Sequence, residues 1–188
     1  MPSRPTHADA STSGASGTSP EPLPRNGVPE PARSAMAIDL SGVPQDCWRF
    51  FEALFLAPSR VSTVRGLARR LDVLPSTLMS RFFRVQLPAP KQYLAIARLV
   101  RAARLFENPG FSVANVANHL DYSSPQSFGR HVRTWMDLTA LQFRDTYDGE
   151  GMLQRFREQL VLPYLPIIRQ LRPLAPTWGP SNPRAMMH

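Results

Sequence analysis

An internal repeat constrains the fold of this chain more than any other feature of its sequence. The stretch LARRLDVLPSTLMSRFF at residues 67–83 has a second version, VANHLDYSSPQSFGRHV, at residues 116–132. The two copies are 49 residues apart at their first residues and 50 residues apart at the proline after the turn, Pro75 or Pro125. The second copy therefore has one extra turn residue, and the repeat indicates that one small structural unit has been duplicated.

Each copy has the pattern of two short helices joined by a turn. In the first copy, Ser62 or Thr63 is expected to cap a helix whose apolar residues follow an i, i+3, i+4, i+7 spacing. These apolar residues are Val64, Leu67, Ala68 and Leu71. Pro75 suits the first position of the next helix, because the N–H that it lacks would have no partner there. The buried stripe of that helix is expected to be Leu78, Phe82 and Val85.

The second copy follows the same plan. Ser112 is placed to cap its first helix, and Ser124 with Pro125 opens its second helix. The residues expected inside are Val113, Val116, Ala117, Leu120, Phe128, Val132 and Trp135. Two short amphipathic helices across a brief turn make a helix-turn-helix unit, so the sequence predicts two such units.

The segments around the units complete an all-α prediction: two helix-turn-helix subdomains joined by a long linker helix, with a disordered N-terminal tail and a helical C-terminal extension. Residues 91–108 contain no Pro or Gly and are expected to form the linker helix, about 25 Å long at about 1.5 Å per residue. The expected boundaries are 1–40 for the disordered tail, 45–146 for the two-unit domain (first unit about 45–88, second unit 112–146), 150–172 for the extension and 173–188 for a flexible tail.

The charge of the chain favours a polyanionic partner. It has 22 basic and 14 acidic residues, a net charge of +8, and Lys91 is the sole lysine. Between residues 60 and 144 there are 13 basic and 4 acidic residues, a local net charge of +9 over the predicted units. Arginine suits planar, bidentate recognition of phosphate and guanine, so this pattern is typical of nucleic-acid binding.

Several other classes of protein are disfavoured. A single cysteine, Cys47, excludes a disulfide framework and a cysteine zinc site, and it is expected to be a small core residue. His119 and His131 stand where the first copy has Arg70 and Arg81, so phosphate contact or solvent exposure is expected for them, not metal ligation. The sequence shows no catalytic triad motif and no glycine-rich phosphate loop, so neither an enzyme nor a cofactor is expected. Without a signal sequence or a membrane span, the chain is expected to act in the cytoplasm.

The second copy and the linker together resemble a known family. VANHLDYSSPQSFGRHVRTWMDLTALQFR carries an aromatic after the turn (Tyr122), a core Phe128 with Arg130 two residues on, and a closing Phe143-Arg144 pair. YLAIARLVRAARLFEN is similar to the family's linker helix. Residues from about 45 to 146 thus resemble the DNA-binding domain of the AraC/XylS family of bacterial transcription regulators. The resemblance implies sequence-specific DNA binding, with the two units in adjacent major grooves.

The chain departs from the family pattern at several turns. Where the family usually has glycine, this sequence has Asp72, Leu87, Asp121 and Asp137. Asp tolerates a left-handed conformation better than most residues, whereas Leu does not. In the first recognition helix, the family's frequent arginine is replaced by Ser80.

In the second unit, Phe128 and Val132 are expected in the core, which leaves the opposite helix face open to DNA. The base-contact candidates on this face are Gln126, Ser127 and Arg130. Arg130 is expected to read guanine through O6 and N7, and Gln126 to engage adenine. Arg133, one turn further, is expected to contact phosphate.

In the first unit, the base-contact candidates are Ser76, Met79 and Ser80, with Phe83 on the same face. None of these side chains forms a bidentate pair with a base, so a weaker, more shape-dependent reader is expected. The phosphate candidates, which position the protein without specifying sequence, are Arg65, Arg69, Arg70, Arg81 and Arg84.

Some alternatives remain open. The extension carries Met152, Leu153, Phe156 and Leu160 on one face, which either pack back on the domain, join two chains or meet RNA polymerase. The tail before Gln45 is short and polar, so the chain resembles members that lack a sensor domain, and we expect one molecule rather than two per DNA site. The second class of function is a non-catalytic helical adaptor that binds protein.

Overall fold

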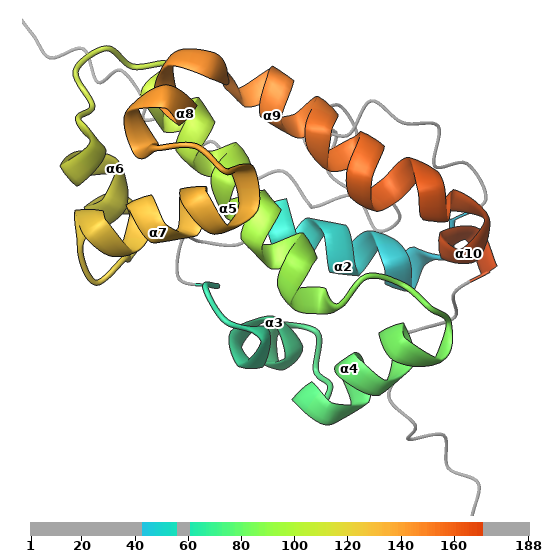
Figure 1. Ribbon diagram of the computed structural model, residues 1–188. Coiled ribbons are helices and arrows are strands. Elements are labelled where there is room, and N and C mark those ends of the chain that lie inside the picture. The colour runs from blue at the N-terminus through green and yellow to red at the C-terminus, as the bar shows by residue number, and fades with distance from the viewer. Residues whose placement is uncertain (1–42, 56–60, 171–188) are drawn as a thin grey trace, which may run out of the picture.

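The computed structural model describes residues 43–55 and 61–170, and all the regular structure within them is helical (Figure 1). The helices are α2 (Gln45–Phe55), α3 (Val64–Arg70), α4 (Pro75–Arg84), α5 (Pro90–Phe106), α6 (Val113–His119), α7 (Pro125–Met136), α8 (Ala140–Thr146), α9 (Gly149–Phe156) and α10 (Leu165–Gln170), with a π-helical turn η1 (Arg157–Val161) and a 3₁₀ turn η2 (Leu162–Tyr164). The predicted all-α fold is confirmed for this part of the chain. The predicted tails, 1–40 and 173–188, lie outside the described residues.

The two predicted helix-turn-helix units are present as α3 with α4 and as α6 with α7. Residues 71–74 join the first pair and residues 120–124 join the second, so the extra residue lies in the second turn, as predicted. Of the two predicted caps for α3, Thr63 is the one used: its hydroxyl accepts a hydrogen bond from the N–H of Gly66 at 3.0 Å. Ser112 caps α6 as expected.

Both turns contain an aspartate in the left-handed region, with φ of 55° at Asp72 and at Asp121. The following N–H, from Val73 or Tyr122, donates to the carbonyl five residues earlier at 3.0 and 2.9 Å. This hydrogen bond ends the helix and reverses the chain. The tolerance of aspartate for this conformation therefore replaces glycine in both turns.

The end of α4 differs from the prediction. The left-handed residue there is Gln86, with φ of 57°, and not Leu87. Leu87 is buried, and its N–H donates to the Phe82 carbonyl at 3.0 Å. The exposed glutamine takes the strained conformation, and the leucine stays in the core. In the second unit α7 continues to Met136 and the left-handed residue is Asp137, so the two copies lose their register at this point.

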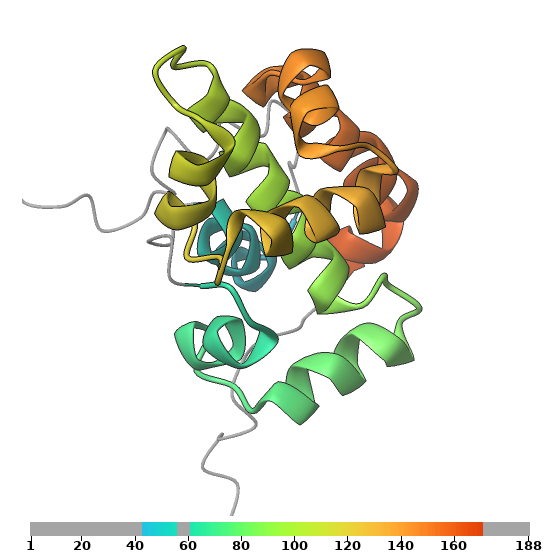
Figure 2. The same cartoon turned by 60° about the vertical axis from the view of Figure 1, so that its left-hand side comes forward.

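The predicted linker helix is the centre of the molecule. Helix α5 begins at Pro90, one residue before the predicted start, and ends at Phe106. Its buried residues occupy nearly all sides: Pro90, Tyr93, Leu94, Ala95, Ile96, Ala97, Leu99, Val100, Ala102, Ala103 and Phe106. A helix with buried residues on most of its sides has neighbours on most of its sides. In α5 these neighbours are both helix-turn-helix units, α2, α8 and α9 (Figures 1 and 2).

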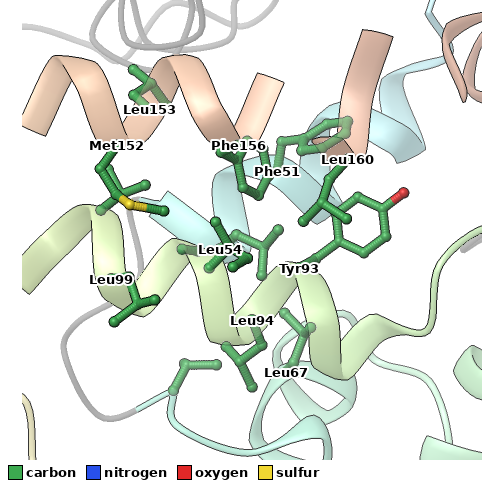
Figure 3. Packing of buried hydrophobic residues seen from close by; sticks show 14 of the residues in the cluster. Phe51, Leu54, Leu67, Tyr93, Leu94, Leu99, Met152, Leu153, Phe156 and Leu160 are labelled. Carbon is green, nitrogen blue, oxygen red and sulfur yellow. The ribbon is translucent and has the colours of Figure 1, made fainter. Parts of the chain in front are cut away.

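The C-terminal extension packs back on this centre, which is one of its three predicted placements. Helix α9 lies along α5 (Figure 3). The Phe156 ring lies 5.0 Å from that of Phe55 and 6.2 Å from that of Tyr93, measured between centroids. The buried thiol of Cys47, a core residue as predicted, donates to the Ile168 carbonyl of α10 at 3.4 Å. The extension therefore shares one core with α2 and α5.

Candidate nucleic-acid interface

Helix α7 has a closed face and an open face. Phe128 and Val132 are fully buried, whereas Gln126, Arg130 and Arg133 are exposed. The helix begins at a capping box, in which the Ser124 hydroxyl accepts from the N–H of residue 127 at 3.1 Å. The open face therefore presents one amide and two guanidinium groups from a firmly capped helix.

Ser127 differs from the other base-contact candidates of the second unit. Its side chain is half-buried, and its hydroxyl accepts from the N–H of Ser124 at 3.1 Å and donates to the carbonyl of that residue at 2.9 Å. The hydroxyl of Ser123 lies within 3.0 Å of it. Ser127 thus helps to cap α7 and is less accessible than Gln126 or Arg130.

Helix α4 has the same arrangement with different chemistry. Leu78 and Phe82 are buried, and on the other side Ser76 is exposed and Ser80 half-buried. The phosphate candidates Arg65, Arg69, Arg70 and Arg84 are exposed, and Arg81 is half-buried. Figures 1 and 2 show α4 and α7 inclined in a similar direction, with α5 running between the two units.

Arg98 of α5 holds the second unit in place. Its Nη2 donates to the Leu120 carbonyl at 3.0 Å, and its guanidinium carbon lies 3.9 Å from the centroid of the Tyr122 ring. Both contacts are to the turn of the second unit. A hydrogen bond and a cation–π contact from one buried helix fix the angle at which α6 and α7 leave it.

Arg101, one turn along α5, reaches the other way. Its Nη2 donates to the Leu54 carbonyl near the end of α2. Burial, and secondarily the charge of Arg98, lowers the pKa of Arg101. Neither of these two contacts was predicted from the sequence. Together the two contacts tie α5 to the turn of the second unit and to α2, and no local sequence pattern predicts partners so far away along the chain.

His131 overturns an expectation. Predicted to contact phosphate or solvent, it is half-buried against α5, where its Nε2–H donates to the Ala95 carbonyl at 3.1 Å. Burial, opposed by this hydrogen bond and aided by the charge of Arg98, lowers the pKa of His131 to about 4. The prediction was taken from the alignment of His131 with Arg81 in the repeat. It was wrong because α7 packs on α5 at this position. His119 is exposed as expected, with its ring beside that of Phe111.

Comparison with known protein families identifies this arrangement. Residues 67–146 match the family described as helix-turn-helix domain, in its AraC-family form. Residues 67–146 are an AraC-type DNA-binding domain. The match begins within α3 and ends with α8, so it includes both units and α5. No curated protein and no solved structure matches the chain.

The AraC-type domain is a regulatory DNA-binding domain and belongs to no enzyme family. It includes both exposed helix faces and most of the basic residues described above. Helices α2, α9 and α10 lie outside the match. Across residues 43–55 and 61–170, no helix combines the length and the apolar character that crossing a membrane requires.

Proposed function

We propose that the chain is a sequence-specific transcription regulator that places α4 and α7 in adjacent major-groove faces on one side of a DNA duplex. The observation that carries the proposal is the pair of equivalent helices with buried inner faces and exposed outer faces, both packed on α5. Successive major-groove faces recur about every 34 Å along one side of B-DNA, so one rigid molecule can reach two of them.

In this proposal the second unit reads bases directly. Arg130 pairs with guanine O6 and N7, and Gln126 near the start of α7 pairs with adenine. Ser127 contributes chiefly by fixing the start of the helix. Arg133 contacts phosphate, which sets position without specifying sequence.

The first unit adds contacts from α3 and α4. Ser76, Met79 and Ser80 face the base edges. The phosphate contacts come from Arg65, Arg69, Arg70, Arg81 and Arg84. One molecule binds one asymmetric site, since the two recognition helices differ in every exposed side chain that would meet a base.

Two substitutions on α7 test this assignment. Arg130→Ala should flatten the sequence preference at one base pair, because a bidentate contact with guanine discriminates by about 1–3 kcal/mol. Arg133→Ala should weaken binding to all sequences alike and reduce its salt dependence. Binding to a randomised DNA pool followed by sequencing, with affinities measured at two salt concentrations, separates the two roles. Identical effects of both substitutions would refute the assignment.

A footprint and a mass measurement test the geometry. Protection should fall on two neighbouring major grooves on a common side of the duplex. Analytical ultracentrifugation of the complex should find one chain per site. Two chains per site, or protection of a single groove, would contradict the proposed arrangement.

A further inference from the structure

The open face of α4 is apolar where that of α7 is cationic. Met79 is 45% exposed and Phe83 is 84% exposed. In the repeat these residues correspond to Gly129 and Arg133, at the offset of 50 residues that holds after the turn. At the position where α7 exposes Arg133, α4 therefore exposes Phe83.

The surroundings of this apolar face indicate the charge of its partner. The exposed basic residues of the same unit are Arg65, Arg69, Arg70 and Arg84. Across α3, α4 and their turn the one acidic residue is Asp72. An exposed apolar face on a unit whose exposed charges are almost all positive complements a polyanion that carries apolar groups, and the major groove of DNA is such a surface.

We propose that α4 recognises the 5-methyl groups of thymines through Met79 and Phe83. Thymine is the base that presents a methyl group in the major groove, and apolar side chains contact it. Neither Met79 nor Phe83 donates a hydrogen bond to a base edge, so a methyl group is the feature that they distinguish. This inference rests on the proposed DNA-binding function and names the base that the first unit selects.

The spacing of the two side chains sets the spacing of the methyl groups. Met79 and Phe83 are four residues apart on one helix, about 6 Å along its axis at about 1.5 Å per residue. This distance corresponds to roughly two base-pair steps of about 3.4 Å. The DNA under α4 is therefore rich in thymine, whereas that under α7 contains the guanine read by Arg130.

Replacing thymine with deoxyuridine tests the inference, because it removes the methyl group and leaves every hydrogen-bonding atom. On the DNA site selected by the full chain, each thymine under α4 is replaced in turn and the affinity is measured by fluorescence anisotropy at fixed salt. At two positions the affinity should fall about fourfold, which is the effect of losing the burial of one methyl group. Replacements under α7 at positions paired with no apolar side chain should have no such effect.

Matched protein variants assign each methyl group to its side chain. Met79→Ala and Phe83→Ala should each abolish the uracil effect at one position, whereas Arg130→Ala should retain both effects. Both side chains are exposed, so the two variants should unfold at the same temperature as the parent chain when thermal unfolding is monitored by circular dichroism. A uracil effect that is absent under α4, or that survives both alanine substitutions, overturns the inference.

The same data separate this inference from the proposed function. If the chain selects no discrete site, the proposed function fails. If a site is selected and Arg130→Ala alters it, but the α4 half is insensitive to methyl removal, the inference alone fails. Phe83→Ala that leaves all DNA affinities unchanged and reduces self-association in ultracentrifugation would assign the face to a second copy of the chain and overturn the inference.

Discussion

At the scale of single residues, polar side chains as well as apolar ones form the contact between α5 and the second unit. Arg98 and His131 each bond to a backbone carbonyl, of Leu120 and Ala95 respectively. The Tyr122 ring lies between them, 3.9 Å from the Arg98 guanidinium carbon and 5.6 Å from the centroid of the His131 ring. A carbonyl accepts from a neutral imidazole without placing a charge in the interior, so the neutral form of His131 suits this site.

The stability of the protein should therefore decrease as the pH falls through the range set by His131. The unfolded chain binds a proton near the ordinary histidine pKa of 6.5, whereas burial lowers the pKa of His131 in the folded state to about 4. Between these values the unfolded state binds more protons, so the free energy of unfolding falls as the pH is lowered from 6.5 to 4. Urea unfolding at several pH values measures this slope.

The control for this prediction uses the other histidine of the second unit. His131→Gln keeps a hydrogen-bond donor and removes the titration, so its unfolding free energy should depend less on pH than that of the parent chain. The matched variant His119→Gln changes an exposed side chain and should retain the parental slope. An unaltered slope in His131→Gln would contradict the assigned cause.

At the scale of elements, the two recognition helices begin in different ways. Ser124 caps α7 through a capping box, whereas Leu74 at the start of α4 provides no side-chain hydrogen bond and is largely exposed. A serine cap stabilises a helix by about 1 kcal/mol relative to an apolar residue. The start of α7 is therefore the more firmly held, which agrees with direct base reading by that helix.

Helix positions and the α7 cap could be predicted from the sequence because they depend on local signals. Ser112 and Ser124 mark helix starts by accepting from the N–H three residues further on, and Pro125 marks one because its missing N–H needs no partner there. The left-handed Gln86 and the half-buried His131 could not be predicted in this way. Gln86 is left-handed because the next residue, Leu87, packs in the core, and His131 is placed by its contact with α5. A repeat alignment carries no information about such neighbours.

Two glycines at different places in the helices should respond in opposite directions to replacement by alanine. A Cβ atom added at Gly149, the first residue of α9, would lie 2.2 Å from Cγ of Arg104 and 2.8 Å from Oε1 of Glu107. Gly149→Ala should therefore destabilise the contact between α9 and α5. At Gly129, within α7, a Cβ atom meets nothing within 4 Å.

Gly129→Ala should accordingly stabilise the protein by about 0.5–1 kcal/mol, the usual difference between the two residues within a helix. Chemical unfolding of both variants beside the parent chain measures the difference. The close approach of α9 to α5 would be contradicted if Gly149→Ala were as stable as Gly129→Ala.

At the scale of the whole molecule, the DNA-binding domain does not contain its own complete core. Helices α2 and α9 lie outside the family match, yet their aromatic rings meet those of α5. The sequence predicted an apolar face on the extension, because helical periodicity is a local property. It left open what that face would contact, because packing over more than 50 residues of sequence has no local signal.

Phe156 is completely buried and lies among the rings of Phe51, Phe55 and Tyr93 (Figure 3). Phe156→Ala should lower the free energy of unfolding by about 3–5 kcal/mol, because it leaves a cavity between α9, α2 and α5. The loss should appear in the unfolding of the whole domain, monitored both by circular dichroism and by DNA binding, since one core supports both units.

The control lies in the same C-terminal segment. Leu162 is 46% exposed, so Leu162→Ala should change the free energy of unfolding by no more than about 0.5 kcal/mol. A parallel loss of helicity and DNA binding in Phe156→Ala alone would establish that the extension acts as part of the DNA-binding domain. The opposite result would be an early unfolding transition of Phe156→Ala that involves only a few helical turns, while DNA binding persists up to the unfolding midpoint of the parent chain. It would show that the two units do not need the packing of α9.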